Sequence, residues 1–491
     1  MEPEPKLTFE TIVARARALA GQSVEQPDRT MPESLRNLDF TRYRSIRFRP
    51  KQALWRGESL FEIQLFHRGF LYEEPVAINV VEDGVSRRVT FSTDLFNYGE
   101  SGTPQDAADD IGFAGFRVHF PLNASDYADE AASFLGASYF RLLGRAQIYG
   151  LSGRGLAVDT ALPKGEEFPR FREFWLLKPA PDATSITILA LLDSQSVTGA
   201  YRFEIQPGAP TEMEVQAELF TRGRITRLGV APMTSMFLFG ENQPRSFDDF
   251  RPEVHDSDGL QISTAAGEWI WRPLSNPGQL RVTSFVGDMR GFGLMQRDRD
   301  YENYLDIHLH YERRAHLWME PLEGAWNGGS VVLVEIPAPE EVHDNIVSFW
   351  APKDPLEAGT SRSYRYRLYT SMPDTALDRL GKVRRTRLGS VRMHGGNRNA
   401  LAGARRIVVD FSGGPLDTLA NGQPVQAEIS SSAGEVSDVY VQKAPEAGTW
   451  RASFRLIPAG ESPADMRLYL SLRGRRLTET WSYIRDTNAR E

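Results

Sequence analysis

The sequence has no cysteine among its 491 residues. Disulfide bonds, thiolate catalysis and cysteine-ligated metal sites are therefore excluded. The absence does not identify a cellular compartment, because proteins of oxidising compartments can also fold without disulfide bonds. Redox chemistry on cysteine is excluded for the same reason.

Long apolar runs are also missing. The longest, ITILALL at 186–192, is much shorter than the ~18 residues that a membrane span needs. Residues 1–21 lack both the basic and the apolar region of a signal peptide. The sequence has no Walker loop, no dinucleotide-binding glycine loop and no Gly-x-Ser-x-Gly elbow. A membrane helix and the nucleotide-binding and serine-hydrolase motifs are therefore not indicated.

The chain carries no large excess of charge of one sign. It has 57 basic and 65 acidic residues, which give a formal net charge of −8. This balance does not favour a nucleic acid or an anionic membrane surface as partner, and a neutral ligand such as a sugar fits better. HLH at 308–310 places His308 and His310 on the same face of a predicted strand, and His316 could complete a metal site. We expect surface or hydrogen-bonding histidines instead, and therefore no metal and no cofactor.

Helical patterns are few, and β patterns with many turns dominate. The chain has 41 glycines and 30 prolines, a composition that favours β-sandwiches. Residues 8–21 predict an amphipathic helix with Thr8 as N-cap and Gly21 at its end. Residues 129–144 are a second helix candidate. Period-two alternation at 61–81, 200–208 and 363–371 predicts strands with one buried face.

The length favours at least two domains, and the clearest boundary lies near 372–404, which is basic and rich in glycine. Beyond it, short strand patterns predict a small immunoglobulin-like sandwich. These patterns occur at 405–413, 424–432, 436–442, 449–458, 466–474 and 478–484. We predict an N-terminal β-sandwich over 1–378, a linker over 379–403 and a C-terminal domain over 404–491.

Residue types that can carry sugar chemistry are concentrated in 237–352. Five of the eight histidines and five of the nine tryptophans fall there. Acids are dense as well: Asp256, Asp258, Asp298, Asp300, Asp306 and Asp344. Aromatic rings stack on sugars, and a carboxyl group beside an aromatic wall can act as a general acid. The alternative is that the tryptophans belong to the core and the acids to turns.

Several segments in this region and outside it resemble the periplasmic glucan biosynthesis family, proteins G and D. The segments are FLGASYFRLLGRAQIYGLSGRGLAVDT (134–160), SMFLFGENQPRSFDDFRPEVHDSDGLQI (235–262), GEWIWRPLSNP (267–277), GFGLMQRDRDYENY (291–304), VVLVEIPAPEEVHDNIVSFWAP (331–352) and LTETWSY (477–483). The resemblance runs from about residue 8 to the end. It implies an all-β protein with a galactose-mutarotase-like N-terminal sandwich and an immunoglobulin-like C-terminal domain.

The family implies residence in the periplasm, so we expect a signal peptide to have been removed from the chain. Family members act on osmoregulated periplasmic glucans, whose backbone is β-1,2-linked glucose. Some are inverting endo-β-1,2-glucanases. The resemblance therefore leaves three activities open: hydrolysis of linear β-1,2-glucan, transglycosylation or cyclisation of the same chain, and binding without catalysis. A membrane partner in glucan synthesis and a homodimer are both compatible with the family.

The resemblance also implies site residues. The general acid carries over to Asp344 of VHDNIVSFW, where the following apolar run would favour the protonated carboxyl group. The general base carries over to Asp256 of RPEVHDSDGL, acting through water and a substrate hydroxyl. Residues that we expect to bind the substrate are Asn242, Arg251, Glu253, Trp271, Tyr311, Arg313 and Trp318.

The sequence departs from the family pattern in two places. Arg314-Ala315-His316 stands where an Arg-Pro-Ser-like run is expected, and Asp258 is a carboxylate where some relatives have asparagine. These departures affect the sugar subsites and the path of the attacking water, and they leave both predicted catalytic aspartates in place.

Overall fold

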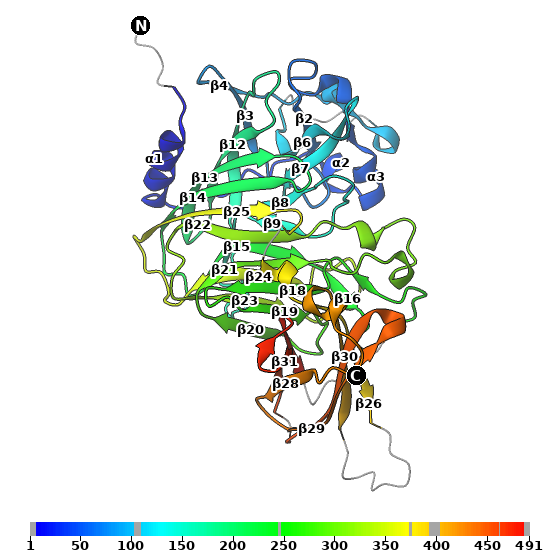
Figure 1. The fold of residues 1–491 in the computed structure, drawn as a ribbon. Coiled ribbons are helices and arrows are strands. Elements are labelled where there is room, and N and C mark those ends of the chain that lie inside the picture. The colour runs from blue at the N-terminus through cyan, green and yellow to red at the C-terminus, as the bar shows by residue number, and fades with distance from the viewer. Residues whose placement is uncertain are drawn as a thin grey trace. The chain divides into compact units, whose positions relative to one another are not determined.

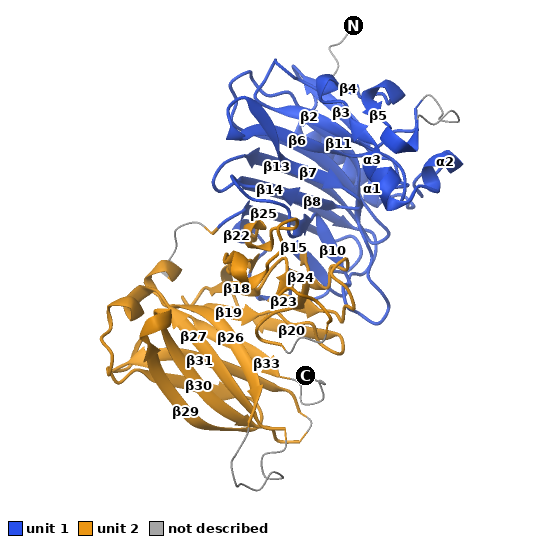
Figure 2. Cartoon of the chain, turned by 90° about the vertical axis from the view of Figure 1, so that its right-hand side faces the viewer, with its two compact units in different colours: residues 1–233, 319–330, 349–371 blue, residues 234–318, 331–348, 372–491 orange. Residues whose placement is uncertain are grey.

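The computed structural model describes residues 6–102, 110–243, 247–372, 376–391, 403–460 and 462–485 (Figure 1). Strands dominate, so the predicted all-β class is confirmed. No helix in these ranges is long and apolar enough to cross a membrane. The chain forms two compact units (Figure 2): unit 1 is 1–233, 319–330 and 349–371, and unit 2 is 234–318, 331–348 and 372–491. These units do not follow the predicted domains, whose boundaries remain a prediction.

Unit 1 contains the three α-helices and two groups of paired strands. Its elements are α1 (Phe9–Ala20), α2 (Glu33–Arg36), α3 (Phe40–Ser45), η1 (Pro50–Gln52), η2 (Thr93–Leu95), η3 (Gly99–Ser101), β1 (Arg47–Phe48), β2 (Glu62–His67), β3 (Ala77–Glu82), β4 (Val85–Arg88), β5 (Phe96–Asn97), β6 (Phe113–Ala124), β7 (Tyr127–Leu135), β8 (Tyr139–Leu142), β9 (Ser152–Arg154), β10 (Leu156–Val158), β11 (Arg170–Leu177), β12 (Ile186–Asp193), β13 (Val197–Gln206), β14 (Glu212–Thr221) and β25 (Ser361–Tyr369). Four strands have residues in both units: β15 (Leu228–Ser235), β22 (Leu317–Gly324), β23 (Gly329–Glu335) and β24 (Ile346–Pro352).

The core of unit 1 lies between two sheets. One has the strand order β2-β6-β7-β8-β9, and the other has the order β4-β3-β11-β12-β13-β14-β25. Phe134 of β7 contacts Phe174 of β11 and Phe203 of β13, with ring centroids 5.4 and 5.2 Å apart. Edge-to-face contacts of this kind bury large apolar surfaces and fix the sheets face to face. The strands predicted at 61–81, 200–208 and 363–371 are confirmed as β2 with β3, β13 and β25.

The helix predicted at 8–21 is confirmed as α1. The Thr11 hydroxyl accepts a hydrogen bond from the Thr8 backbone N–H at 3.1 Å, and the helix ends before Gly21. Its apolar face packs on Trp175, Leu189 and other buried residues of the second sheet, with Ile12 fully buried.

The helix predicted at 129–144 is wrong. This segment forms most of β7 and all of β8, joined by a turn at Gly136, whose φ is +75°. Residues 131–134 are all buried, so this half of β7 is covered on both faces. Burial on both faces removes the polar alternation by which a strand is recognised, and the alanines of the run imitate a helix.

Unit 2 contains the remaining strands. They are β16 (Phe237–Phe239), β17 (Val254–His255), β18 (Gly259–Thr264), β19 (Trp269–Pro273), β20 (Arg281–Val286), β21 (Met289–Met295), β26 (Lys382–Ser390), β27 (Arg405–Ser412), β28 (Gln426–Ser431), β29 (Glu435–Ala444), β30 (Thr449–Ile457), β31 (Ala464–Leu472), β32 (Arg475–Arg476) and β33 (Thr480–Arg485). Its 3₁₀ helices are η4 (Tyr301–Asn303), η5 (Tyr311–Arg313), η6 (Ala376–Arg379), η8 (Gly414–Thr418) and η9 (Pro445–Ala447). All six strands predicted after residue 404 are confirmed as β27, β28, β29, β30, β31 and β33.

Part of the predicted linker 379–403 is a strand, which its sequence pattern did not indicate. Residues 382–390 form β26, which pairs antiparallel with β27 in a sheet of order β26-β27-β30-β29. The Val383 N–H donates to buried Glu479 at 2.8 Å, and Glu479 also pairs with Arg297 at 2.7 Å. A bulge beside Arg384 and the many arginines hide the strand pattern in the sequence. Residues 392–402 of the predicted linker lie outside the described residues.

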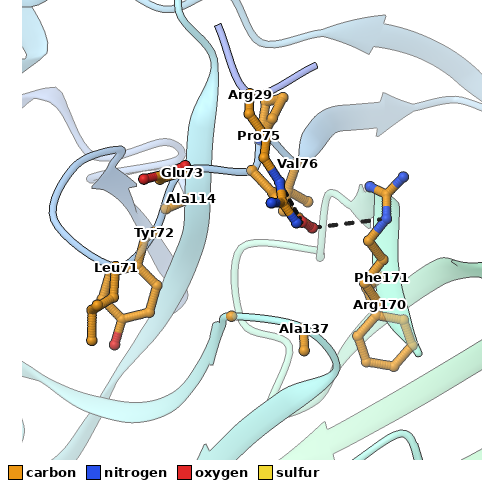
Figure 3. A pocket seen from close by; sticks show the side chains of 12 residues that line it. Arg29, Leu71, Tyr72, Glu73, Pro75, Val76, Ala114, Ala137, Arg170 and Phe171 are labelled. Carbon is orange, nitrogen blue, oxygen red and sulfur yellow. Dashed lines mark hydrogen bonds and ion pairs between the residues drawn. The ribbon is translucent and has the colours of Figure 1, made fainter. Parts of the chain in front are cut away.

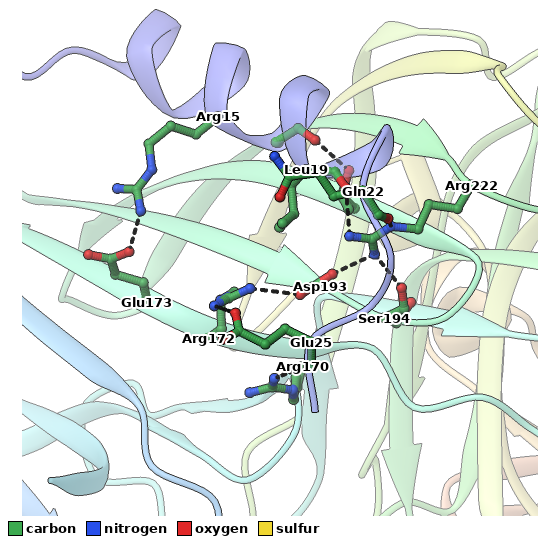
Figure 4. A network of polar contacts seen from close by, with 12 residues as sticks. Arg15, Leu19, Gln22, Glu25, Arg170, Arg172, Glu173, Asp193, Ser194 and Arg222 are labelled. Carbon is green, nitrogen blue, oxygen red and sulfur yellow. Dashed lines mark hydrogen bonds and ion pairs between the residues drawn. The ribbon is translucent and has the colours of Figure 1, made fainter. Parts of the chain in front are cut away.

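Within unit 1, a buried ion pair connects helix α1 to strand β12 (Figure 4). Asp193, which is 1% exposed, accepts from Arg222 at 2.6 Å and from Arg172 at 3.0 Å. Arg222 also donates to the backbone carbonyls of Leu19 at 2.7 Å and Gln22 at 3.1 Å. One guanidinium therefore connects the end of α1 to the end of β12.

We predict that Arg222→Met lowers the free energy of unfolding by about 3–5 kcal/mol, because it leaves the Asp193 carboxylate buried with one partner fewer. The matched control is Arg224→Met, since Arg224 forms an exposed pair with Glu357 at 3.1 Å. An exposed pair contributes about 0–1 kcal/mol. Melting temperatures of both variants check this, and equal shifts would contradict it.

Candidate active site

The residues predicted to form the active site all belong to unit 2. The structure brings Asp256, Arg251 and Tyr311 into one polar network. The position of Asp344 is tied to the same region through its neighbour Asn345. Asn242, Trp271 and Trp318 lie in the interior, and so does the Tyr311 side chain, which is 1% exposed.

Asp256 lies between two strands, directly after β17 and before β18. It is 6% exposed, and its backbone N–H donates to the Met236 carbonyl at 2.8 Å. Its carboxylate forms an ion pair with Arg314 at 2.7 Å. The Arg314 guanidinium lies over the Tyr311 ring, 4.4 Å from its centroid. A guanidinium paired with a carboxylate at 2.7 Å favours the ionised form in general, and this is the form that a general base requires.

Tyr311 connects Asp256 to the loop that carries Asp344. The Tyr311 hydroxyl donates to Glu341 at 3.1 Å, and the Glu341 carboxylate also pairs with Arg251 at 2.7 Å. Burial, followed by the negative charge of Glu341, raises the pKa of the Tyr311 phenol, so the phenol stays protonated and acts as a donor. Arg251 further pairs with Asp249 at 2.7 Å and Asp306 at 3.1 Å.

Asn345 fixes the backbone next to Asp344. Its side-chain oxygen accepts from the Phe237 N–H at 2.8 Å, and its amide nitrogen donates to the Phe237 carbonyl at 2.9 Å. Phe237 pairs with His255 between β16 and β17, and His255 directly precedes Asp256. The backbones of Asp344 and Asp256 are therefore linked through Asn345, Phe237 and His255.

The environment expected for Asp344 is not present. Asp344 is exposed, and burial begins one residue later at Asn345. The apolar run Ile346–Trp350 belongs to β24, in which all five of these residues are buried, whereas Asp344 precedes the strand. Apolar surroundings therefore do not hold the Asp344 carboxyl group protonated in this structure.

Three other predicted residues are buried and do not line a surface. Asn242 is buried and donates to the Leu274 carbonyl at 2.7 Å. Trp271 is buried under Arg297, whose guanidinium is 3.7 Å from the ring centroid. Trp318 stacks on Trp269 at 5.6 Å. Arg313, in contrast, is exposed.

Glu253 belongs to a buried cluster beneath Asp256. His255 is 1% exposed and contacts Glu253 through Nε2 and Gln296 through Nδ1, both at 2.9 Å. The Gln296 amide nitrogen donates to the carbonyls of His255 and Tyr311, so its oxygen is left to accept from Nδ1. Burial alone would lower the pKa of His255, but the hydrogen bond and charge of Glu253 outweigh it and raise this pKa to about 9. His255 is therefore an imidazolium that donates from both nitrogens at neutral pH.

The predicted geometry of the histidine pair is wrong. Residues 307–309 form a turn, in which the Asp306 carboxylate accepts from the N–H groups of His308 and Leu309 at 2.9 and 2.8 Å. A turn does not place His308 and His310 on one face. Within the described ranges, no group of three or more His, Asp or Glu side chains is arranged to hold a metal ion.

Sequence reasoning did not identify Arg314, Glu341 and Asn345 as site residues. Arg314 was noted only as a departure from the family pattern, and it is the residue that pairs with Asp256. Glu341 and Asn345 lie in the same stretch as Asp344, so the density of polar residues at 340–345 was the available signal.

Asp258 supports the same loop region. Its carboxylate accepts from the backbone N–H groups of Arg297 and Asp298, both at 2.9 Å. Burial raises the pKa of Asp258, and the nearby His255 charge opposes the shift. These two backbone contacts indicate a structural role for Asp258.

The raised pKa of His255 predicts a pH-dependent stability. The folded protein holds this proton up to a pKa of about 9, whereas the ordinary value is 6.5. The contribution of His255 is therefore complete below about pH 6.5 and is lost as the pH rises through 9. We expect the melting temperature to fall over this range, and His255→Gln to flatten the fall. The control is His343→Gln, at an exposed position. An unchanged slope in His255→Gln would contradict the assignment.

Comparison with known proteins agrees with these motifs. The family model described as "Periplasmic glucan biosynthesis protein, MdoG" matches residues 7–485. Glucans biosynthesis protein G of Rhodopseudomonas palustris strain CGA009 is 48% identical, covering 95% of this chain and 91% of the relative. The protein of the same name from Ralstonia nicotianae is 45% identical, over 96% and 95%. Probable glucans biosynthesis protein D of Shewanella oneidensis is 43% identical, over 98% and 89%. The chain belongs to the periplasmic glucan biosynthesis protein family.

Proposed function

We propose that this family member is an inverting endo-glucanase that cleaves linear β-1,2-glucan in the periplasm during glucan biosynthesis. The observation that carries the proposal is the Asn345–Phe237–His255 connection, which ties the backbone of Asp344 to that of Asp256 across β16 and β17. The two carboxyl groups differ in environment, since one is buried beside a cation and the other is exposed. Unequal environments are how a pair of carboxyl groups divides acid and base roles.

Asp256 is the proposed base. Its carboxylate pairs with Arg314 at 2.7 Å, and the contact with Met236 fixes its backbone. In an inverting reaction, water attacks the anomeric carbon from the face opposite the leaving oxygen, and its proton passes to the base. A substrate hydroxyl between the water and Asp256 would carry this proton.

Asp344 is the proposed acid. As the glycosidic bond breaks, its proton passes to the leaving oxygen, so each turnover consumes one water and leaves one new reducing end. Because Asp344 is exposed in this structure, a bound glucan chain has to supply the cover that raises its proton affinity.

Arg251 and Arg313 are the proposed contacts to glucan hydroxyls, and Tyr311, which was expected to bind the substrate, is 1% exposed and supports them from the interior. Arg251 is held by three carboxylates and Tyr311 by Glu341, so both are fixed before a ligand arrives. Buried Asn242, Glu253, Trp271 and Trp318 would support the site from below.

The products of the reaction separate hydrolysis from its alternatives. Mass spectrometry after incubation with linear β-1,2-glucan should show shorter linear chains. Products that lack one water would indicate cyclisation or transfer, and unchanged glucan would indicate binding alone. A homodimer and a membrane partner in glucan synthesis remain predictions.

We predict that Asp344→Asn and Asp256→Asn each lower kcat by at least ~10²–10⁴-fold, because the amide neither delivers nor accepts the transferred proton. Glucan binding and melting temperature should change little in Asp344→Asn, whose side chain is exposed. Asp258→Asn is the matched control: an amide oxygen can still accept from the two backbone N–H groups, so activity should remain near that of the unaltered chain. Full activity in a folded Asp344→Asn variant would rule out the mechanism.

We predict that Arg314→Gln lowers kcat by about 10²-fold with little change in KM, because Asp256 loses the partner that orients and charges it. Arg313→Gln is the neighbouring control, and it should raise KM instead, since Arg313 is exposed and proposed to touch the ligand. Steady-state kinetics on linear β-1,2-glucan distinguish the two patterns. The same kcat and KM changes in both variants would contradict a separate role for Arg314.

A further inference from the structure

Unit 1 contains a groove that none of the proposed catalytic residues lines. Two cavities, of about 350 and 400 Å³, share Arg29, Glu74, Ala137 and Arg170 as lining residues (Figure 3). Shared walls make them neighbouring parts of one groove. Each is within the size range of pockets that bind small molecules.

The two cavities share a carboxylate that lies between two guanidinium groups. Arg29 donates to Glu74 Oε1 at 3.1 and 2.6 Å, and Arg170 lies 3.8 Å from Glu74 Oε2. Arg29 uses two of its five N–H donors in these bonds, so donors remain for a ligand. In Figure 3, dashed lines mark these polar contacts of Arg29 and Arg170 among the lining side chains.

An aromatic ring with an exposed surface stands at one end of the groove. Phe168 is 53% exposed, and the buried Arg154 guanidinium lies 5.0 Å from its ring centroid. Arg154 is held in turn by Glu166 at 2.7 Å. The phenyl ring is thus supported by a cation while much of its surface remains open, which is the arrangement of a stacking platform.

Buried side chains hold the groove walls in place before any ligand binds. Arg68 is 2% exposed and donates to the backbone carbonyls of Thr30, Glu73 and Ile111, which joins the segments on either side of the first cavity. At the second cavity, Arg172 joins Glu25 to Asp193 at 2.9 and 3.0 Å (Figure 4). Fixed walls reduce the entropy that binding would otherwise cost.

The charges of the groove favour an uncharged ligand. Arg29 and Arg170 both face Glu74, and the other carboxylates of the second cavity have partners of their own. Glu25 and Asp193 pair with Arg172, and Glu167 accepts from the N–H and hydroxyl of Ser196, both at 2.7 Å. An anion would meet this row of carboxylates, whereas hydroxyl groups can both donate to them and accept from Arg29.

We propose that this groove of unit 1 is a second carbohydrate-binding site, which takes a segment of uncharged, linear gluco-oligosaccharide with one sugar ring stacked on Phe168. The choice of glucan as the ligand rests on the proposed function. The residues of the groove are separate from Asp256, Asp344 and their network, so the groove binds sugar without contributing to bond cleavage.

The test is calorimetric titration of the full chain carrying Asp344→Asn with a linear β-1,2-gluco-oligosaccharide. We expect two binding events, of which Phe168→Ala weakens one by roughly tenfold and leaves the other unchanged. Phe40→Ala is the matched control, because Phe40 is a comparably exposed phenylalanine of unit 1, at 58%, that does not line the groove. Melting temperatures confirm that both variants are folded.

Each outcome decides the proposal. Two binding events with unchanged affinities in Phe168→Ala, or a single event that this change does not affect, would overturn the second site. Competition by sulfate would overturn the uncharged class of ligand. Hydrolysis is measured separately, with the chain that carries Asp344 as the reference. Loss of hydrolysis in Asp344→Asn would support the proposed function. If binding were at the same time unaffected in Phe168→Ala, the second binding site would be rejected while the proposed function stood.

Discussion

The Asn345 side chain is the contact on which the proposed site depends. The buried Asn345 amide bonds to both the backbone N–H and the backbone carbonyl of Phe237. It makes the two hydrogen bonds that the backbone of a paired strand would make with Phe237. Its nitrogen also donates to the Ile336 carbonyl at 3.1 Å, which closes the 336–345 loop on itself. Because leaving any of these buried groups without a partner costs about 1–3 kcal/mol, the amide fixes where the backbone of Asp344 emerges.

From this fixed backbone, a chain of charged and aromatic groups reaches the second aspartate. Glu341, Tyr311, Arg314 and Asp256 are connected in that order by a hydrogen bond, a cation–π contact and an ion pair. Gln296 holds Tyr311 and His255 through their backbone carbonyls, so the network is supported from below by the imidazolium cluster. Asp344, the residue before Asn345, is exposed.

The parts of the fold that the sequence predicted are those with a one-sided pattern. Helix α1 and strands β30 and β31, for example, each have a buried and a more exposed face, and period and capping residues revealed them. The failures share a cause. In β7, residues 131–134 are buried on both faces. In β26, the many arginines hide a strand whose Val383 N–H bonds to Glu479. At 307–309, hydrogen bonds to the Asp306 side chain hold a turn in place of the predicted strand. Local patterns do not contain such tertiary contacts. For the site, the family motifs supplied Asp256 and Asp344, but the partners Arg314 and Asn345 became visible only in three dimensions.

The stereochemistry of the first products tests the proposed function most directly. Attack by water opposite the leaving oxygen inverts the anomeric carbon, so the β-linkage should yield a new reducing end in the α configuration before mutarotation. Time-resolved proton NMR of a fresh digest of linear β-1,2-glucan distinguishes the two anomers. The arrangement of Asp256 and Asp344 predicts that the α anomer appears first. A β anomer at the earliest times, or no new reducing end, would contradict it.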